Sequence, residues 1–449
     1  MPEHFDLIVR GGSVWAASAI GNDVRADVGI RGGRFAALGD LRGASADAEI
    51  DATHLAVLPG VIDSQVHFRE PGLEHQEDLE RGTAGAALGG VTAVFEMPNT
   101  KPNTDTAEAL ADKLARARGR AWVDHAFYVG ATANNADHLG ELENLPGAAG
   151  IKVFMGSSTG SLLVADDATL ERVLAHARRR VAVHCEDEQR LIERRSLIPA
   201  QGAHVRMHPL WRDEETALRA TTRLLRAARA TGRRVHALHI TTADEMTLLR
   251  QHKDLATVEV LPQHLTLVAP DCYDRLGTYA QMNPPIRDAR HHAALWAAVR
   301  DGTVDVLGSD HAPHTRAEKD KPYPASPSGM TGVQTLLPLM LDHVAHGRLT
   351  LERLVDLTSA GQQRVFGLVN KGRIAIGYDA DLTLVDRAAK RTIEEKWIAS
   401  RCGWSPFTGM TVTGWPVATI VRGRAVMRDD QLIGTPAGEP IRFDEALRA

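Results

Sequence analysis

The middle of the chain alternates short apolar runs with longer amphipathic stretches. Between about residues 57 and 365, β-rich apolar runs occur at Ala56–Ile62, Val91–Met97, Ile151–Met155, Val181–Val183, Val235–Ile240, Val258–Leu261 and Val304–Leu307. The stretches between these runs show the spacing of amphipathic helices. Repeated strand–helix units predict a parallel sheet. An open, doubly wound sheet would fit, but the size favours a closed α/β architecture, the (β/α)8 or TIM barrel.

Two of the predicted helices have recognisable starts. Asp105 or Thr106 can cap a helix that ends near Gly119, and Asp213 can open another. Apolar residues recur at helical spacing in both, which predicts that each helix buries one face. These residues are Leu110, Leu114 and Ala117 in the first helix and Leu218, Leu225 and Ala228 in the second.

Both ends of the chain instead show short strand-like runs separated by turns. Leu7-Ile8-Val9 precedes Gly11-Gly12, and the run from Val417 to Val421 precedes Arg422-Gly423. This spacing is typical of antiparallel strands. Because chain termini commonly lie close together, we expect one small β-sandwich domain assembled from both ends. The predicted division is 1–56 and 366–449 for the sandwich and tail, and 57–365 for the barrel.

Composition and charge narrow the class of protein. The 449 residues, 43% of them hydrophobic and 24% charged, suit a globular protein with one large and one smaller domain. The net charge of -5 gives no electrostatic reason to bind nucleic acid or an anionic membrane. The arginine runs at 178–180 and 233–234 are short, and we expect them to be solvated helix ends or loops.

The cysteines and the apolar runs suggest a cytoplasmic protein. Cys185, Cys272 and Cys402 are few, odd in number and far apart, which disfavours a disulfide scaffold. We expect Cys185 to pack in the core. The first ten residues lack an apolar run of signal-peptide length, and no run of about 18 apolar residues predicts a membrane helix.

Polar, metal-binding side chains stand at the carboxyl ends of the predicted barrel strands. In such barrels the functional groups project from these ends. A single histidine there is more often structural, but three histidines, an aspartate and a lysine together indicate a metal centre suited to Zn²⁺. The lysine lies in an apolar strand, where its charge is costly unless it is paired or removed. These residues are His67, Lys152, His184, His239 and Asp310.

Several sequence motifs resemble those of one enzyme family. They are Pro59-Gly60-Val61-Ile62-Asp63, His67-Phe68-Arg69-Glu70-Pro71-Gly72, Met97-Pro98-Asn99-Thr100, the run from Gly308 to His314, and Gly377-Tyr378-Asp379-Ala380-Asp381-Leu382. Across nearly its full length the chain resembles the amidohydrolase superfamily, in particular its dihydroorotase–hydantoinase–allantoinase branch and, within that branch, the dihydroorotases. The fold of that family is a barrel with a small β-sandwich, which agrees with the pattern described above.

The resemblance also implies roles for individual residues. It implies that Lys152 is carboxylated, that Asp310 both binds metal and shuttles a proton, and that one or two Zn²⁺ ions are bound. The metal ligands it implies are His67, Lys152, His184, His239 and Asp310, with Gln65 at a sixth position. The substrate-binding residues it implies are Arg69, Asn99, Asn283 and His314. We therefore expect a small-molecule substrate, dihydroorotate, opened reversibly to N-carbamoyl-L-aspartate in pyrimidine synthesis, and a homo-oligomeric enzyme.

Arg69 decides between substrates in this interpretation. Its planar guanidinium suits a carboxylate, which dihydroorotate has and which hydantoins and dihydropyrimidines lack. The alternative is a surface ion pair between Arg69 and Glu70 or Glu74.

Two departures from the family pattern keep other functions open. Gln65 stands where the first strand usually ends in His-x-His, so one metal position is weakened. Ser328 precedes Gly329 where a Phe is usual, and Lys152 stands where many dihydroorotases of this type have Asp. The alternatives are hydantoinase, dihydropyrimidinase or allantoinase activity, or a catalytically impaired partner of aspartate transcarbamoylase.

Overall fold

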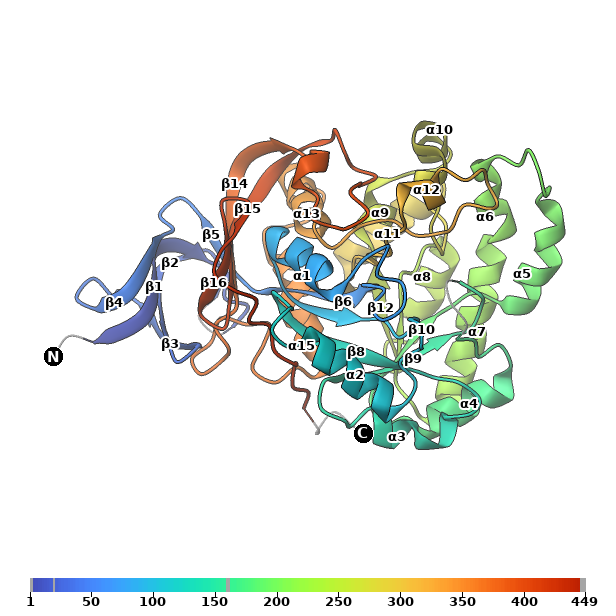
Figure 1. The fold of residues 1–449 in the computed structure, drawn as a ribbon, viewed down its shortest axis with the longest axis horizontal. Helices are drawn as coiled ribbons and strands as arrows, with labels where there is room; N and C mark the ends of the chain where they lie inside the picture. The colour runs from blue at the N-terminus through green and yellow to red at the C-terminus, as the bar shows by residue number, and fades with distance from the viewer. Residues whose placement is uncertain (1–2, 19–20, 159–161, 445–449) are drawn as a thin grey trace.

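The computed structural model describes residues 3–18, 21–158 and 162–444 and contains two sheets. One sheet lies beside the N-terminus and the other, to its right in Figure 1, is surrounded by helices. In the described part of the chain, no helix is long and apolar enough to cross a membrane.

The central sheet is an eight-stranded parallel barrel. Its strands follow one another in chain order, and the segment after the last strand pairs with the first through the parallel bridge between Val66 and His311. Nearly every residue of these strands is buried, as expected for a sheet covered on both faces. The strands are β6 (Val61–Val66), β7 (Val91–Glu96), β8 (Asp124–Gly130), β9 (Ala148–Phe154), β10 (Val181–His184), β11 (Val235–Ala237), β12 (Ala256–Val260) and β13 (Val306–Leu307).

Helices in the connections pack around the barrel (Figure 1). They are α1 (Leu79–Leu88), α2 (Ala107–Ala117), α3 (Leu139–Leu142), α4 (Asp167–His176), α5 (Glu188–Arg194), α6 (His208–Trp211), α7 (Glu214–Thr231), α8 (Ala243–Arg250), α9 (Pro262–Thr266), α10 (Asp271–Leu276), α11 (Ala289–Asp301), α12 (Arg316–Lys319), α13 (Leu336–Ala345), α14 (Leu351–Val355) and α15 (Gly361–Phe366). The two predicted starts are present: the Thr106 side chain caps α2 and the Asp213 side chain caps α7. Leu114 and Leu218 lie only half-buried at the edges of the buried faces.

The second sheet combines both ends of the chain, as the sequence predicts. It has nine strands: β1 (His4–Val14), β2 (Val24–Arg31), β3 (Arg34–Gly39), β4 (Ser45–Asp51), β5 (Ala56–Pro59), β14 (Leu382–Thr392), β15 (Thr411–Val421), β16 (Arg424–Arg428) and β17 (Gln431–Leu432). Most pairs are antiparallel, but β4 and β5 both pair parallel with β1, so the sheet is mixed. β5 connects the two chain ends, because it pairs with β1 on one side and β14 on the other.

Candidate metal centre and active site

One pocket collects the side chains from the carboxyl ends of the barrel strands. It measures about 350 Å³ when the open solvent at its mouth is included, and every predicted metal or substrate residue except His314 lines it. The lining residues are Gln65, His67, Arg69, Asn99, Lys152, Phe154, Ser158, His184, His239, Asn283, Asp310, Ala312, Ser328 and Gly329. His314 lies behind this wall, with its Nε2 3.3 Å from Arg69 Nη2. The barrel thus brings together residues that are more than 200 positions apart in the sequence.

Asp310 contacts two residues at the carboxyl end of strand β6, Gln65 within the strand and His67 just after it. Its Oδ1 is 3.2 Å from His67 Nε2 and accepts a hydrogen bond of 3.1 Å from Gln65 Nε2. On the other side of the imidazole, His67 Nδ1 donates to Asn99 Oδ1 at 2.7 Å. Because that bond holds the proton on Nδ1, the Nε2 lone pair of a neutral His67 is left free to bind a metal.

His184 and His239 form a second pair of potential metal ligands, and their imidazole nitrogens face each other. The His184 Nδ1 and His239 Nε2 atoms are 3.1 Å apart. His184 Nε2 donates to Glu186 Oε2 at 2.9 Å, and Glu186 also pairs with Arg212. With the proton of His184 held on Nε2 by Glu186, its Nδ1 lone pair points toward His239. A carboxylate behind an imidazole in this way fixes its ring orientation and tautomer for metal binding.

Lys152 acts electrostatically on both pairs. Its side chain is 1% exposed, its Nζ lies 4.5 Å from the Phe154 ring centroid, and no described carboxylate forms an ion pair with it. Burial lowers the pKa of Lys152 to about 7, although Asp310 and Glu259 counteract this. A substantial fraction of the amine is therefore neutral near pH 7, which is the form that can react with CO₂.

Burial also keeps the three imidazoles in the form that binds metal. It lowers the pKa of His67 to about 4 and the pKa values of His184 and His239 below the usual range. For Asp310, burial opposes ionisation, but the contact with His67 and the charge of the nearby Lys152 bring its pKa below the ordinary value. Neutral imidazoles and an ionised carboxylate are the donors that Zn²⁺ prefers.

The donor set fits a metal, although the described side chains are not closed around one point. No three His, Cys, Asp or Glu residues in the described part of the chain form a ready-made metal-binding group. The donors instead form two separate pairs, and two buried atoms, Gln65 Oε1 and His239 Nδ1, have no hydrogen-bond partner among the described residues. The charge of Lys152 affects the pKa values of His67, His184, His239 and Asp310. A carboxylated Lys152 would therefore complete one set of metal ligands together with these four residues.

Arg69 is a buried pocket residue, so the alternative of a surface ion pair is wrong. The side chain is 1% exposed, and its guanidinium is held by the Pro313 carbonyl, 3.2 Å from Nε, and by His314. Glu70 pairs with Arg120 on the other side of the chain. Burial lowers the pKa of Arg69 to about 10, so the group stays charged at neutral pH. A charged guanidinium with no described carboxylate partner in the pocket is suited to bind an anionic group of a ligand.

Asn283 is positioned by His208. The His208 Nε2 atom lies 2.9 Å from Asn283 Oδ1, and Asn283 Nδ2 lies 3.4 Å from Ser158 Oγ. His208 is fully buried at the start of α6, so it supports the pocket from behind. His75 and His204 lie outside the pocket, and His264 bonds to the Pro284 carbonyl at 3.1 Å.

Sequence reasoning missed two buried carboxylates beside the site. Glu186 lies two residues after His184, and Glu259 accepts hydrogen bonds from Ser64 Oγ at 2.9 Å and from the His239 backbone N–H at 3.3 Å. Glu259 interrupts an apolar strand just as Lys152 does, so the same pattern could have identified it. Backbone conformation adds a signal that sequence does not carry: Arg69, His239 and Asp310 all have positive φ angles. Such strained residues cluster at functional sites.

Comparison with known proteins now identifies the family. The sequence profile described as "Amidohydrolase family" matches residues 56–426. The chain belongs to the amidohydrolase family. The prediction of a hydrolase of this family is therefore confirmed, and the protein is an enzyme.

Full-length relatives of this amidohydrolase carry three different names. A dihydroorotase of Methanosarcina acetivorans is 35% identical over 429 residues, which are 92% of this chain and 90% of the relative. An allantoinase of Rubrobacter xylanophilus is 37% identical over 453 residues, 98% of each chain. Among solved structures, the L-hydantoinase of Arthrobacter aurescens superposes with a TM-score of 0.92 at 30% identity, covering 98% of this chain and all of that one. The branch of the family is thus shown, and the relatives differ in substrate.

Proposed function

We propose that this amidohydrolase reversibly opens the ring of dihydroorotate to give N-carbamoyl-L-aspartate. The observation that carries the proposal is Arg69, a buried, charged guanidinium that faces the pocket without a described carboxylate partner. Dihydroorotate carries a ring carboxylate that would supply this partner. The dihydroorotases among the relatives support the same substrate.

The proposed cofactor is Zn²⁺, one or two ions. The side chains that would hold it are His67, His184, His239, Asp310 and a carboxylated Lys152, with the amide oxygen of Gln65 as a weaker donor. A bound metal would supply a water molecule that loses its proton near neutral pH.

The chain's own residues account for the movement of the proton. Asp310 is ionised and can accept the proton of the attacking water as the new C–O bond forms at the ring carbonyl. When the ring C–N bond breaks, the protonated Asp310 can deliver the same proton to the leaving nitrogen. The hydrogen bond from Gln65 and the contact with His67 hold the Asp310 carboxylate in place through both steps. In the reverse direction Asp310 first accepts the proton from the attacking nitrogen as the C–N bond forms and then returns it to the oxygen that leaves as water.

Substrate position would depend on Arg69 and Asn283. Arg69 would bind the ring carboxylate with two parallel hydrogen bonds. The hydrogen bond from Arg69 Nε to the Pro313 carbonyl fixes the guanidinium group before the substrate binds. Asn99 is engaged with His67, so its main contribution would be to orient that imidazole.

A second candidate function is hydrolysis of a ring without a carboxylate, as the names of the allantoinase and hydantoinase relatives suggest. Ser328 favours it, because a small polar side chain lines the pocket where dihydroorotases usually have Phe. A catalytically impaired partner of aspartate transcarbamoylase is the third candidate, and Gln65 is the residue that favours it.

A substrate panel on metal-replete protein tests these candidates. Turnover of dihydroorotate, dihydrouracil, hydantoin and allantoin would be compared as kcat/KM at equal enzyme concentration. We expect dihydroorotate to be the best substrate. Faster turnover of allantoin or hydantoin would replace the proposed substrate with that ring, and no turnover of any of the four in protein with bound zinc would favour the impaired partner.

A further inference from the structure

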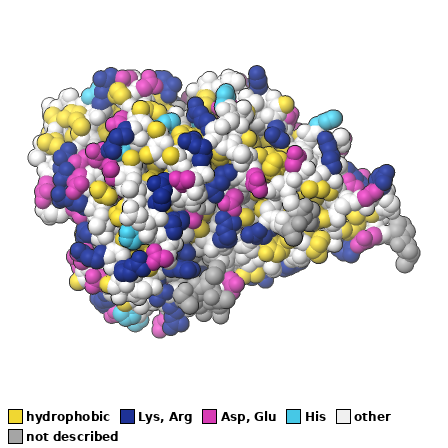
Figure 2. Space-filling view, turned by 180° about the vertical axis from the view of Figure 1, so that it is seen from behind, with side chains coloured by type: hydrophobic (Ala, Val, Ile, Leu, Met, Phe, Trp, Pro, Cys, Tyr) yellow, Lys and Arg dark blue, Asp and Glu magenta, His cyan; other side chains and the backbone are white. Residues whose placement is uncertain are grey.

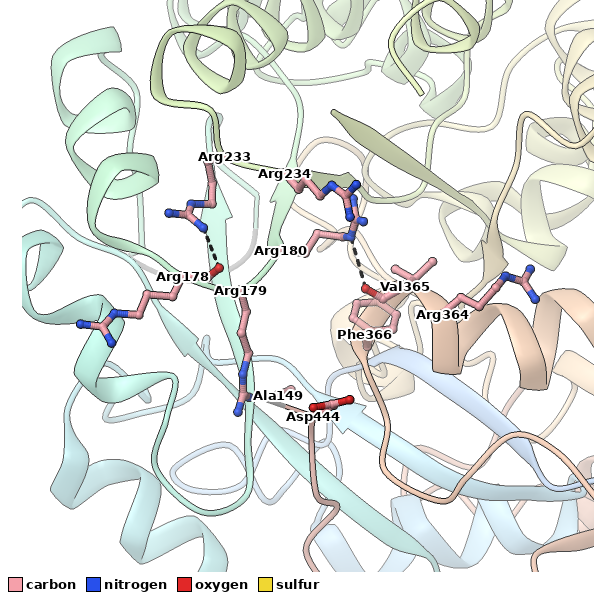
Figure 3. A pocket seen from close by; sticks show the side chains of 10 residues that line it. All are labelled: Ala149, Arg178, Arg179, Arg180, Arg233, Arg234, Arg364, Val365, Phe366 and Asp444. Atoms are coloured by element: carbon pink, nitrogen blue, oxygen red, sulfur yellow. Dashed lines mark hydrogen bonds between the residues drawn. The ribbon is translucent and has the colours of Figure 1, made fainter. Parts of the chain in front are cut away.

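A second pocket lies at the opposite end of the barrel from the candidate active site. Figure 3 shows its lining side chains at the amino ends of β10 and β11, and the hollow measures about 550 Å³ when the open solvent at its mouth is included. Six arginines line it: Arg178, Arg179, Arg180, Arg233, Arg234 and Arg364. The two short basic runs of the sequence, which we expected to be merely solvated, therefore meet at one place.

Backbone carbonyl groups fix three of these arginines, one of which is Arg179, whose Nη1 donates to the Ala148 carbonyl at 2.9 Å. Arg180 donates from Nε to the Val365 carbonyl and from Nη1 to the Val235 carbonyl, both at 3.2 Å. Arg233 Nη1 donates to the Arg178 carbonyl at 2.6 Å (Figure 3). Because carbonyl groups carry no net charge, these contacts order the guanidinium groups without neutralising them.

The positive charge in the pocket exceeds the negative charge around it. Arg364 pairs with Asp356 at 2.7 Å, and Glu143 accepts hydrogen bonds from the backbone at 178 and 179. Among the described lining residues the only carboxylate is Asp444. No described carboxylate forms an ion pair with Arg178, Arg180, Arg233 or Arg234.

Arg180 and Arg234 are close enough to repel each other. Burial and the charge of Arg234 lower the pKa of Arg180 to about 10, and Asp305 compensates only in part. In the view of Figure 3 the Arg180 and Arg234 side chains overlap near the centre of the picture. Because backbone carbonyl groups hold Arg180 in place near Arg234, an anion that binds both guanidinium groups would reduce their mutual repulsion.

We propose that this pocket binds the phosphoryl group of a small molecule. A phosphate has oxygen atoms on several sides and a charge of about -2, so it can engage guanidinium groups from two segments at once. Three residues of strand β10 separate Arg180 from His184 of the candidate active site, so the two sites lie at opposite ends of one strand. The site assigned here is independent of the substrate proposed above.

Isothermal titration with inorganic phosphate, pyrophosphate and glycerol phosphate tests the assignment on the full-length protein. Sodium chloride at matched ionic strength controls for screening. Arg234→Gln removes one guanidinium from an exposed position whose side chain makes no hydrogen bond or ion pair with the described residues, so the variant is expected to fold. Arg275→Gln, at an exposed position on α10, is the matched control.

We expect saturable binding of all three phosphates by the native protein and the control. Arg234→Gln should weaken this binding by roughly tenfold or more, the usual effect of losing a charge-assisted contact. Preference for inorganic phosphate or for the ester would show whether the natural ligand is the free ion or a phosphorylated metabolite. Binding that does not saturate, that chloride reproduces, or that both variants retain equally would overturn the proposal.

Discussion

Lys152 shows how a residue whose charge does not suit its buried, apolar strand can indicate a functional role. Its strand, β9, is buried along its whole length, so an ordinary ammonium there loses its hydration without gaining a described ion pair. The resemblance to amidohydrolases implies the resolution of this cost, which is conversion of the amine to a carbamate. Glu259 carried the same sequence signal in β12 and was overlooked, because the resemblance did not single it out.

Replacing Lys152 tests the carbamate. Lys152→Ala should lose most of the hydrolytic activity, because the shared anionic ligand is gone while the imidazoles remain. Short carboxylic acids such as acetate should restore part of kcat by occupying the space that the side chain leaves. Lys390→Ala, on β14 of the other sheet, is the control for the loss of a lysine. Full activity of Lys152→Ala without added acid would contradict the prediction.

Gln65 gives a second prediction for a single residue. Its Nε2 donates to Asp310, and its buried Oε1 has no described partner, so an amide oxygen is the only donor it can offer a metal. An imidazole is the better ligand for Zn²⁺. Gln65→His should therefore tighten the weaker metal position by roughly tenfold or more, since 1.4 kcal/mol corresponds to a factor of ten.

Zinc titration by calorimetry, which gives stoichiometry and affinity, measures the effect of Gln65→His. Gln251→His, at an exposed position after α8, controls for an added surface histidine. If the native protein already binds two zinc ions with equal affinity, the argument from Gln65 is wrong.

At the scale of elements, the sequence predicted helix starts better than strand limits. Thr106 and Asp213 cap their helices because a short polar side chain can accept from the exposed N–H groups of the first turn. The apolar run Ala56–Ile62 predicts a single strand, but it belongs to two sheets: β5 ends at Pro59 and β6 begins at Val61. Strand β8 was missed, because its first two residues, Asp124 and His125, are polar.

Asp213 offers a prediction about an element. Its side chain accepts from Thr216 at the start of α7 and pairs with Arg190 at 2.5 Å. Asp213→Ala should lower the melting temperature, because loss of a helix cap typically costs about 1–2 kcal/mol. Asp213→Asn keeps an oxygen for the cap and removes the charge, so it should lose less.

The stabilising effect of Asp213 should depend on pH. Although burial alone would raise it, the hydrogen bonds from Arg190 and Thr216 lower the pKa of Asp213 to about 2 from an ordinary value of 3.8. Because the folded pKa is the lower one, this stabilisation is complete above about pH 4 and is lost as the pH falls toward 2. The difference in melting temperature between native protein and Asp213→Ala should therefore shrink between pH 4 and pH 3. An unchanged difference over that interval would be incompatible with this account.

At the scale of the whole molecule, sequence predicted the two sheets but not every pairing. Patterns of apolar residues specify which faces are buried, yet the parallel pairing of β4 and β5 with β1 depends on neighbours that are distant along the chain.

The candidate active-site pocket illustrates the same limit of prediction from sequence. Its residues could be predicted one by one, because each lies in or after the carboxyl-terminal part of a strand, but the contacts among Gln65, Asp310 and His67 exist only once the barrel closes. The pocket of arginines was likewise invisible in the sequence, since its two basic runs are more than 50 residues apart.

The last prediction concerns substrate choice, which depends on the closed barrel as a whole. Arg69 follows β6, but its guanidinium is held by Pro313 and His314, which follow β13. Arg69→Met keeps a long side chain and removes the charge, so we expect it to erase most of the preference for dihydroorotate over dihydrouracil and hydantoin while bound zinc is retained. A charge-assisted, bidentate contact contributes on the order of 1.5–3 kcal/mol, which corresponds to roughly ten- to hundred-fold in kcat/KM. The ratio of kcat/KM values for the three rings, with the zinc content of both proteins, measures the effect.

Arg275→Met, at an exposed position, is the control for this substitution. Arg287→Met is not a suitable control, because Arg287 bonds to Thr241 and to the Arg212 carbonyl behind the pocket. If native enzyme and Arg69→Met discriminate equally, the carboxylate is recognised elsewhere and Arg69 only supports His314.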